Sequence, residues 1–198
     1  MGRGFKSPRG HIFMKKLFYI LSLVLAVLAV SGCRSKEGKA DREHAKAMAS
    51  REEFIEIFRS TGRPGTEAVI SHLDSMGFFT MGAGSHHLQE GGLARHSVEV
   101  YRIMKSFAWF QPSGSIAVVA LFHDMGKVRN GGWHTWYSVQ FLKEWGFELT
   151  EEEYLAIYRH HNLESEYFRH PLHRALVVAD AISTGWWKMW HLRKKRKD

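Results

Sequence analysis

A seven-residue apolar run, Ile116 to Phe122, leads directly into His123 and Asp124. A segment this uniformly apolar buries its whole surface, so it predicts a buried helix whose end carries an imidazole and a carboxylate. Burying these two groups unpaired would cost several kcal/mol. Either they form a hydrogen-bonded core pair, or a divalent cation compensates both, because neutral histidine and ionised aspartate are common metal ligands.

Two further polar residues lie at apolar helix positions. His96 belongs to the segment 92–107, whose apolar residues recur at spacings of three and four, so its side chain is expected to face the core. Asp180 lies inside the apolar segment 175–182 and needs a cation or several hydrogen-bond donors. Each alone fits an ordinary core histidine or helix-terminal aspartate. Together with His123 and Asp124, they favour a shared metal.

Three stretches resemble the HD-domain metal-dependent phosphohydrolases, an all-helical family named for its His-Asp pair. They are HHLQEGGLARHS at 86–97, ALFHDMGKV at 120–128 and VVADAIS at 177–183. The family pattern of a histidine, a His-Asp pair and a distant aspartate is met by His96, by His123 with Asp124, and by Asp180. The resemblance covers about residues 65–185 and implies an all-α fold, a compact HD-domain bundle of about six to seven helices.

Many members of this family hold a second metal with two more histidines. His134 follows the His-Asp pair, and His160 and His161 end a helical segment that begins with a predicted capping box, Thr150 with Glu153. Periodicity does not choose between the last two histidines, and the resemblance places His160 at the ligand position. Alternatively, they are surface histidines favoured by the helix dipole. The metal ligands expected from the resemblance are His96, His123, Asp124, Asp180, His134 and His160; His86, His87 and His161 are expected to line the pocket.

This ligand set predicts catalysis by one or two divalent ions, with Mn, Fe, Mg, Co and Ni all acceptable to histidine and aspartate ligands. Such an ion acidifies bound water and offsets charge on phosphoryl oxygens. Asp124 is expected to be a catalytic residue that bridges two ions. Lys127 either places a positive charge against a substrate phosphate, as a second catalytic residue, or is a solvated lysine near a helix end.

No other catalytic architecture stands out in the sequence. The glycines at 82, 84, 91 and 92 have neither P-loop nor dinucleotide-binding spacing. The predicted function is therefore hydrolysis of a phosphomonoester or phosphodiester, with a nucleotide or oligonucleotide-like substrate favoured. The alternative is an envelope lipoprotein that uses the HD fold as a non-catalytic binding or scaffold module.

The only cysteine, Cys33, closes the sequence VSGC, which is similar to the lipobox of bacterial lipoproteins. A basic pair and fourteen mostly apolar residues, 17–30, precede it. This length suits a secretory signal and falls short of the roughly 20 residues that cross a bilayer. We expect cleavage before Cys33, lipidation of Cys33, and a location in the cell envelope with the chain anchored to a membrane. Residues 1–13 are expected to be an extension or a misassigned start.

Charge provides little evidence for nucleic-acid binding. Five of the 28 basic residues precede Cys33, so cleavage lowers the net charge from +8 to about +3. Six more basic residues lie at 188–197, after a cluster of tryptophans. That end either touches anionic lipid or is a core-capping Trp cluster followed by a disordered tail. We expect a small phosphorylated substrate and a membrane contact through Cys33, and no stable nucleic-acid complex.

The expected organisation is a signal peptide at 1–32, a lipid-anchored tether at 33–51, the HD domain at 52–187 and a basic tail at 188–198. With no second cysteine, disulfides within the mature chain are excluded. Glycine and proline residues separate the predicted helices, and no strand alternation persists. Helices are expected at 53–60, 66–76, 92–107, 115–125, 135–145, 151–160 and 172–184.

Overall fold

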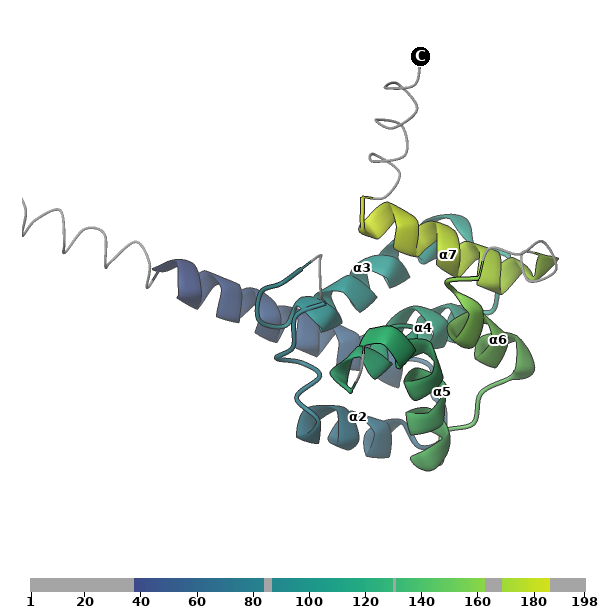
Figure 1. Cartoon of the computed structure of the whole chain (residues 1–198), viewed down its shortest axis with the longest axis horizontal. Helices are drawn as coiled ribbons and strands as arrows, with labels where there is room; N and C mark the ends of the chain where they lie inside the picture. Colours follow the sequence, from purple (N-terminus) through teal and green to yellow (C-terminus); the bar gives the residue numbers. More distant parts are fainter. Residues whose placement is uncertain (1–37, 84–86, 130, 163–168, 186–198) are drawn as a thin grey trace, which may run out of the picture. The chain divides into compact units, whose positions relative to one another are not determined.

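The computed structural model describes residues 38–83, 87–129, 131–162 and 169–185 (Figure 1). Within these ranges the chain is helical and contains no strand, which confirms the predicted all-α class. The signal sequence, Cys33, His86 and the basic tail lie outside the described residues. Among the helices that are described, none combines the length and the apolar character that crossing a membrane would require.

The chain divides into two compact units, residues 1–42 and 43–198. In the first unit, the described residues 38–42 are helical. The second unit opens with helical residues 43–59 and carries the rest of the fold. Helical structure therefore extends through residues 38–51, which lie in the segment expected to be a tether.

Among the described residues, the α-helices labelled in Figure 1 and the short 3₁₀ helices η1 and η2 follow. The α-helices are α2 (Thr66–Ser75), α3 (Gly92–Phe107), α4 (Ser113–Phe122), α5 (His134–Glu144), α6 (Glu151–Arg159) and α7 (Pro171–Ser183), and the 3₁₀ helices are η1 (Met125–Val128) and η2 (Gly131–Trp133).

Helix α4 is the central element of the fold, because it packs against α3, α6, α7 and η1. All seven residues of its apolar run are buried, as the sequence predicts. At its C-terminal end, the ring of Phe122 lies edge-on to Phe54 and Phe58, with centroids 5.7 and 4.8 Å away. These contacts join α4 to the first helix and fix the point at which the chain reaches His123.

The prediction that the central helix runs from 115 to 125 is wrong at its end, because α4 stops at Phe122. The hydroxyl of Ser138, in α5, donates to the His123 carbonyl (3.1 Å) and accepts from the Gly126 amide (2.8 Å). The backbone therefore leaves the α-helix between these two bonds. Asp124 adopts φ −104° and ψ 1°, and the tighter η1 follows.

Gly126 lets η1 approach the start of α5. A Cβ on Gly126 would lie 2.1 Å from the His134 carbonyl oxygen and 2.7 Å from the Cβ of Tyr137. Real Cβ atoms do not approach other atoms so closely, so only glycine allows this contact. Gly126 thereby sets the spacing between Asp124 and His134.

Two helices begin at residues that are typical of helix starts. The capping box at α6 is present: Glu153 N donates to Thr150 Oγ1 (3.2 Å), and Thr150 N donates to Glu153 Oε2 (2.9 Å). The buried Glu153 carboxylate also receives two hydrogen bonds from Arg63 Nη1, at 2.7 and 2.8 Å. Pro171 begins α7, where its missing N–H costs nothing.

Candidate metal centre

Seven histidine and aspartate side chains gather where the ends of several helices meet. The contributing positions are His96 in α3, His123 and Asp124 after α4, His134 at the start of α5, His160 and His161 after α6, and Asp180 in α7. Their potential ligand atoms form two groups, within each of which all atoms lie within 4.8 Å of one another. One group holds His96, His123 and Asp180; the other holds Asp124, His134, His160 and His161.

The first group is closely packed around His96. Its Nε2 lies 3.2 Å from His123 Nε2 and 3.2 Å from Asp180 Oδ1. His123 Nε2 lies 3.8 Å from the same Asp180 oxygen. Both histidines are buried, and the Asp180 side chain is 18% exposed. The group therefore opens to solvent mainly beside Asp180.

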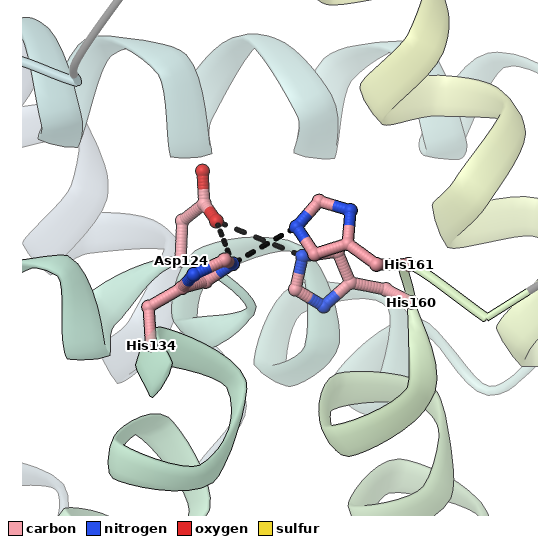
Figure 2. Close-up of side chains that lie close together, drawn as sticks. All are labelled: Asp124, His134, His160 and His161. Carbon is pink, nitrogen blue, oxygen red and sulfur yellow. Dashed lines mark hydrogen bonds and ion pairs between the residues drawn. The ribbon is translucent and has the colours of Figure 1, made fainter. Parts of the chain in front are cut away.

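The second group surrounds one oxygen of Asp124 (Figure 2). Asp124 Oδ1 lies 3.2 Å from His134 Nε2 and 3.6 Å from His160 Nε2. The Nε2 atom of His161 lies 3.0 Å from that of His134. Three imidazoles from the start of α5 and the end of α6 thus converge on a single carboxylate.

The carboxylate of Asp124 faces both groups. Its Oδ1 points toward His134 and His160, and its Oδ2 lies 3.4 Å from His96 Nε2 and 3.5 Å from His123 Nε2. The residue is buried, between the end of α4 and the start of η1. One aspartate can therefore bind a cation with each oxygen.

Local backbone carbonyls orient three of the histidines. The Nδ1 atoms of His123, His134 and His160 lie 2.9, 2.5 and 2.7 Å from the carbonyl oxygens of Ala120, Gly131 and Ile157. In each case the acceptor is the residue three positions earlier. A hydrogen on Nδ1 that is donated to a carbonyl leaves the lone pair of Nε2 free, which is the usual arrangement of a metal-binding histidine.

The imidazole of His96 is oriented by a side chain of another helix and not by a nearby backbone carbonyl. Its Nδ1 lies 3.1 Å from the hydroxyl oxygen of Ser183, in α7. Because Asp180 lies one turn earlier on the same helix, α7 contacts both nitrogens of the His96 ring. The packing of α3 against α7 therefore fixes the direction of this imidazole.

Two buried polar atoms in the second group have no hydrogen-bond partner among the described residues. They are Asp124 Oδ1 and His160 Nε2. Their separation of 3.6 Å is an electrostatic contact without hydrogen-bond geometry. A buried carboxylate oxygen and a buried imidazole nitrogen that face each other without bonding need a third partner. A divalent cation fits this place, because both atoms offer it a lone pair.

Without a bound ion, the pKa of each of these histidines depends on its burial and on the charged groups near it. Burial lowers the pKa of His123 to about 3, and the nearby carboxylates offset this only in part. Burial also acts to lower the pKa of His96, but hydrogen bonds to Asp124 and Asp180 raise it to about 9. Burial and the neighbouring histidines lower the pKa of His161 to about 4.

Both carboxylates are ionised at neutral pH. Burial acts to raise the pKa of Asp180, but its hydrogen bond with His96 and the charge of His123 lower it below its usual value. Burial acts in the same way on Asp124, and there the interaction with His123 and the close imidazoles of His134, His160 and His96 lower the pKa well below its usual value. The centre therefore offers two anions and the neutral imidazoles of His123 and His161, with one proton held on His96.

The residues predicted to line the pocket lie at different places relative to the two groups. The sequence predicts His161 as a pocket-lining residue, and the structure places it in the second group of potential ligands. His87 lies beside the first group, with its ring centroid 5.9 Å from that of His96 and its Nε2 3.2 Å from Glu99. Lys127 forms an ion pair with Asp124 Oδ2 and is partly exposed. His86 lies outside the described residues.

Sequence reasoning missed the hydroxyl groups that position the ligands. Ser138 joins the His123 carbonyl to the Gly126 amide, and Ser183 bonds to His96. Ser183 stands inside the VVADAIS stretch, three residues after Asp180, and this spacing on a helix could have indicated its role. Ser138 carries no such signal, because its partners come from a different element.

The HD domain family model matches residues 93–185, a range that includes all seven side chains of the two groups. Over this range the chain is similar to an HD domain. Members of the HD domain family are generally metal-dependent hydrolases, and the His and Asp groups found over this range are compatible with divalent metal binding. The comparison with curated proteins and the comparison with solved structures each found no match.

Proposed function

We propose that the protein is a metal-dependent phosphohydrolase that cleaves a phosphomonoester or phosphodiester. The observation that supports this most directly is the Asp124 carboxylate, which presents one oxygen to each of two histidine-rich groups. Two adjacent cations joined by a carboxylate suit phosphoester hydrolysis, where attacking and leaving oxygens both need stabilisation.

Each group of side chains would hold one ion. His96, His123 and Asp180 with Asp124 Oδ2 form one set of ligands, and His134, His160 and His161 with Asp124 Oδ1 form the other. Neither set fills an octahedron, so positions remain for water and a phosphate oxygen. A bound divalent cation supplies acidified water and charge neutralisation on the phosphoryl group.

The chain's own residues prepare this site in two ways. The carbonyls that accept from Nδ1 keep three Nε2 lone pairs directed inward, so little reorientation is needed when an ion binds. Lys127 contacts the same Asp124 oxygen that faces the first group. A cation bound to this oxygen would compete with the ammonium, which is partly exposed and could then contact a substrate phosphate.

The proposal is tested with the purified full-length chain, by elemental analysis and a screen of phosphomonoesters and phosphodiesters with Mn, Fe, Mg, Co and Ni. We expect about two metals per chain and hydrolysis of at least one ester class. Asp124→Asn should reduce metal content and lower kcat at least about 100-fold, since it removes a shared ligand.

The matched control is Asp74→Asn, because Asp74 is a partly exposed carboxylate that pairs with Arg51 on the surface. This variant should retain full metal content and activity. Stoichiometric metal without hydrolysis of any ester would refute the proposed activity and favour the non-catalytic module.

We further propose that the protein is a lipid-anchored protein of the cell envelope, attached through Cys33. The support is the VSGC sequence after a basic pair and an apolar segment of signal length. Its substrate would then be a small phosphoester outside the cytoplasm. Metabolic labelling with a fatty-acid analogue should modify the chain and fail in Cys33→Ser; equal labelling of both proteins would contradict the anchor.

A further inference from the structure

A cavity of about 740 Å³ lies between the end of α5, the start of α6 and the segment that joins them. Its volume falls in the range of roughly 300–1,000 Å³ that is usual for small-molecule sites. Its lining includes Val139 and Phe147, which are buried, and Tyr154, which is 39% exposed. The ring of Tyr154 stacks on that of Tyr158, with centroids 5.6 Å apart. The cavity therefore has an apolar floor and an aromatic ring that a ligand can reach.

This cavity is separate from the candidate metal centre. Helices α5 and α6 lie side by side, and the centre takes His134 from the first residue of α5 and His160 from the position after α6 (Figure 1). The cavity takes Lys143 from the last turn of α5 and Tyr154 from near the start of α6. A helix rises about 1.5 Å per residue, so Lys143 lies about 13 Å along α5 from His134. A ligand in the cavity leaves the metal centre free.

Three charged residues of the lining keep their side chains available to a ligand. They are Lys143, Glu148 and Glu151, and all three are exposed. Their side chains form no ion pair with one another or with any other residue that the structure describes. One ammonium group and two carboxylates therefore border the same cavity without neutralising one another.

We propose that this cavity binds a free amino acid with a large apolar side chain. The ammonium group of the ligand pairs with Glu148 or Glu151, and its carboxylate pairs with Lys143. Its apolar side chain covers the floor of the cavity and packs against Tyr154. The metal centre takes no part in this binding, so the inference goes beyond the proposed function and does not depend on it.

The test uses three probes that share a phenyl ring and differ in their charged groups. They are L-phenylalanine, phenethylamine, which lacks the carboxylate, and 3-phenylpropanoate, which lacks the ammonium group. Their binding to the full-length chain is measured by NMR titration. Phenylalanine should bind with a Kd of about 1 mM, as expected for a ligand of this size. Each of the other probes should bind about threefold more weakly, because it loses an ion pair.

Substitutions of the lining locate the two charged groups of the ligand. Lys143→Met should weaken phenylalanine binding about threefold and leave phenethylamine unaffected, because that probe has no carboxylate. Glu148→Gln combined with Glu151→Gln should weaken phenylalanine and phenethylamine and leave 3-phenylpropanoate no weaker. Tyr154→Ala should weaken all three probes, because each of them carries the ring.

Each charge variant has a matched control. Glu144→Gln combined with Glu152→Gln removes two exposed carboxylates from the same two helices, and neither residue lines the cavity. Lys105→Met removes an exposed lysine from the last turn of α3, as Lys143→Met does from α5. Both controls should keep the probe affinities of the unmodified protein.

Three results would overturn this proposal. They are no binding of phenylalanine at about 10 mM, equal affinity for the three probes, and preferences that survive in the charge variants of the lining. Preferences that the lining variants abolish and the controls retain would support the amino-acid site. That result would hold even in a protein that hydrolyses no phosphoester, so the two proposals fail separately.

Discussion

At the scale of single residues, Asp124 and His96 determine how the candidate centre responds to a cation. Asp124 divides its two oxygens between the groups, and His96 contacts both Asp124 and Asp180. With no cation bound, the proton on His96 balances part of their negative charge. A metal ion and this proton compete for the same nitrogen lone pair.

We therefore predict a pH-dependent stability of the metal-free protein. The pKa of His96, about 9 in the folded state, exceeds its usual value of 6.5, so protonation stabilises the fold. This stabilisation is complete below pH 6.5 and is lost as the pH rises through 9, by an amount on the order of a few kcal/mol. Thermal unfolding of chelator-treated protein should show a falling midpoint across this interval.

His96→Gln should remove this fall, because glutamine does not titrate. His44→Ala is the matched control, since His44 is largely exposed and pairs with Glu90 on the surface. It should keep the pH dependence of the unmodified protein. An unchanged midpoint between pH 6.5 and 9 in metal-free unmodified protein would contradict the assigned protonation.

Some residues of the centre could be predicted from the sequence alone, and others could not. The convergence of His96 and Asp180 follows from their apolar helix neighbours, because core-facing side chains of packed helices meet. The choice between His160 and His161 does not follow from periodicity. Helix α6 ends at Arg159, so its apolar periodicity does not decide between the next two side chains, and both imidazoles approach His134.

At the scale of elements, the close contact between η1 and α5 sets the second group. We predict that Gly126→Ala destabilises the fold by about 1–3 kcal/mol, because the added methyl group would collide with the His134 carbonyl. The same displacement should weaken metal binding by the second group. Denaturant unfolding and metal titration measure the two effects.

Gly114→Ala provides the control for this substitution. Gly114 lies in the first turn of α4, and a Cβ there would meet nothing within 4 Å. Alanine should stabilise the helix by up to about 1 kcal/mol and leave metal binding unchanged. Equal effects of the two substitutions would show that the contact at Gly126 does not position His134.

Element boundaries were predictable where local signals mark them. The bounds 92–107 of α3 agree with the predicted segment, and the capping box marks the start of α6. The end of α4 was not predictable, since the apolar run gives no sign of the Ser138 bonds that end the helix. The Ser138 hydroxyl belongs to a later helix, α5, so it reaches the end of α4 only after the chain has folded.

At the scale of the whole molecule, the candidate ions would join α3, α5 and α7 to the ends of α4 and α6. We predict that metal removal lowers the melting temperature by about 5–10 °C, since a ligand present at 100 times its Kd stabilises by about 2.7 kcal/mol. Calorimetry with and without chelator measures this shift. Asp124→Asn should melt at the same temperature in both conditions.

A chelator-insensitive melting temperature in unmodified protein that contains metal would contradict this coupling. The overall class could be predicted from the sequence, because three stretches resemble an all-helical family and no strand alternation persists. The exposure of Trp133 could not, because an indole near a glycine pair fits a core or a surface equally well.

Three of the imidazoles take their direction from a carbonyl three residues earlier in the chain. Their aim is thus set within a single turn of backbone, independently of the neighbouring helices. Substitutions that shift the helices against one another would alter the distances between these rings while preserving where each one points. Helix packing would therefore affect the centre through the spacing of its rings and not through their direction.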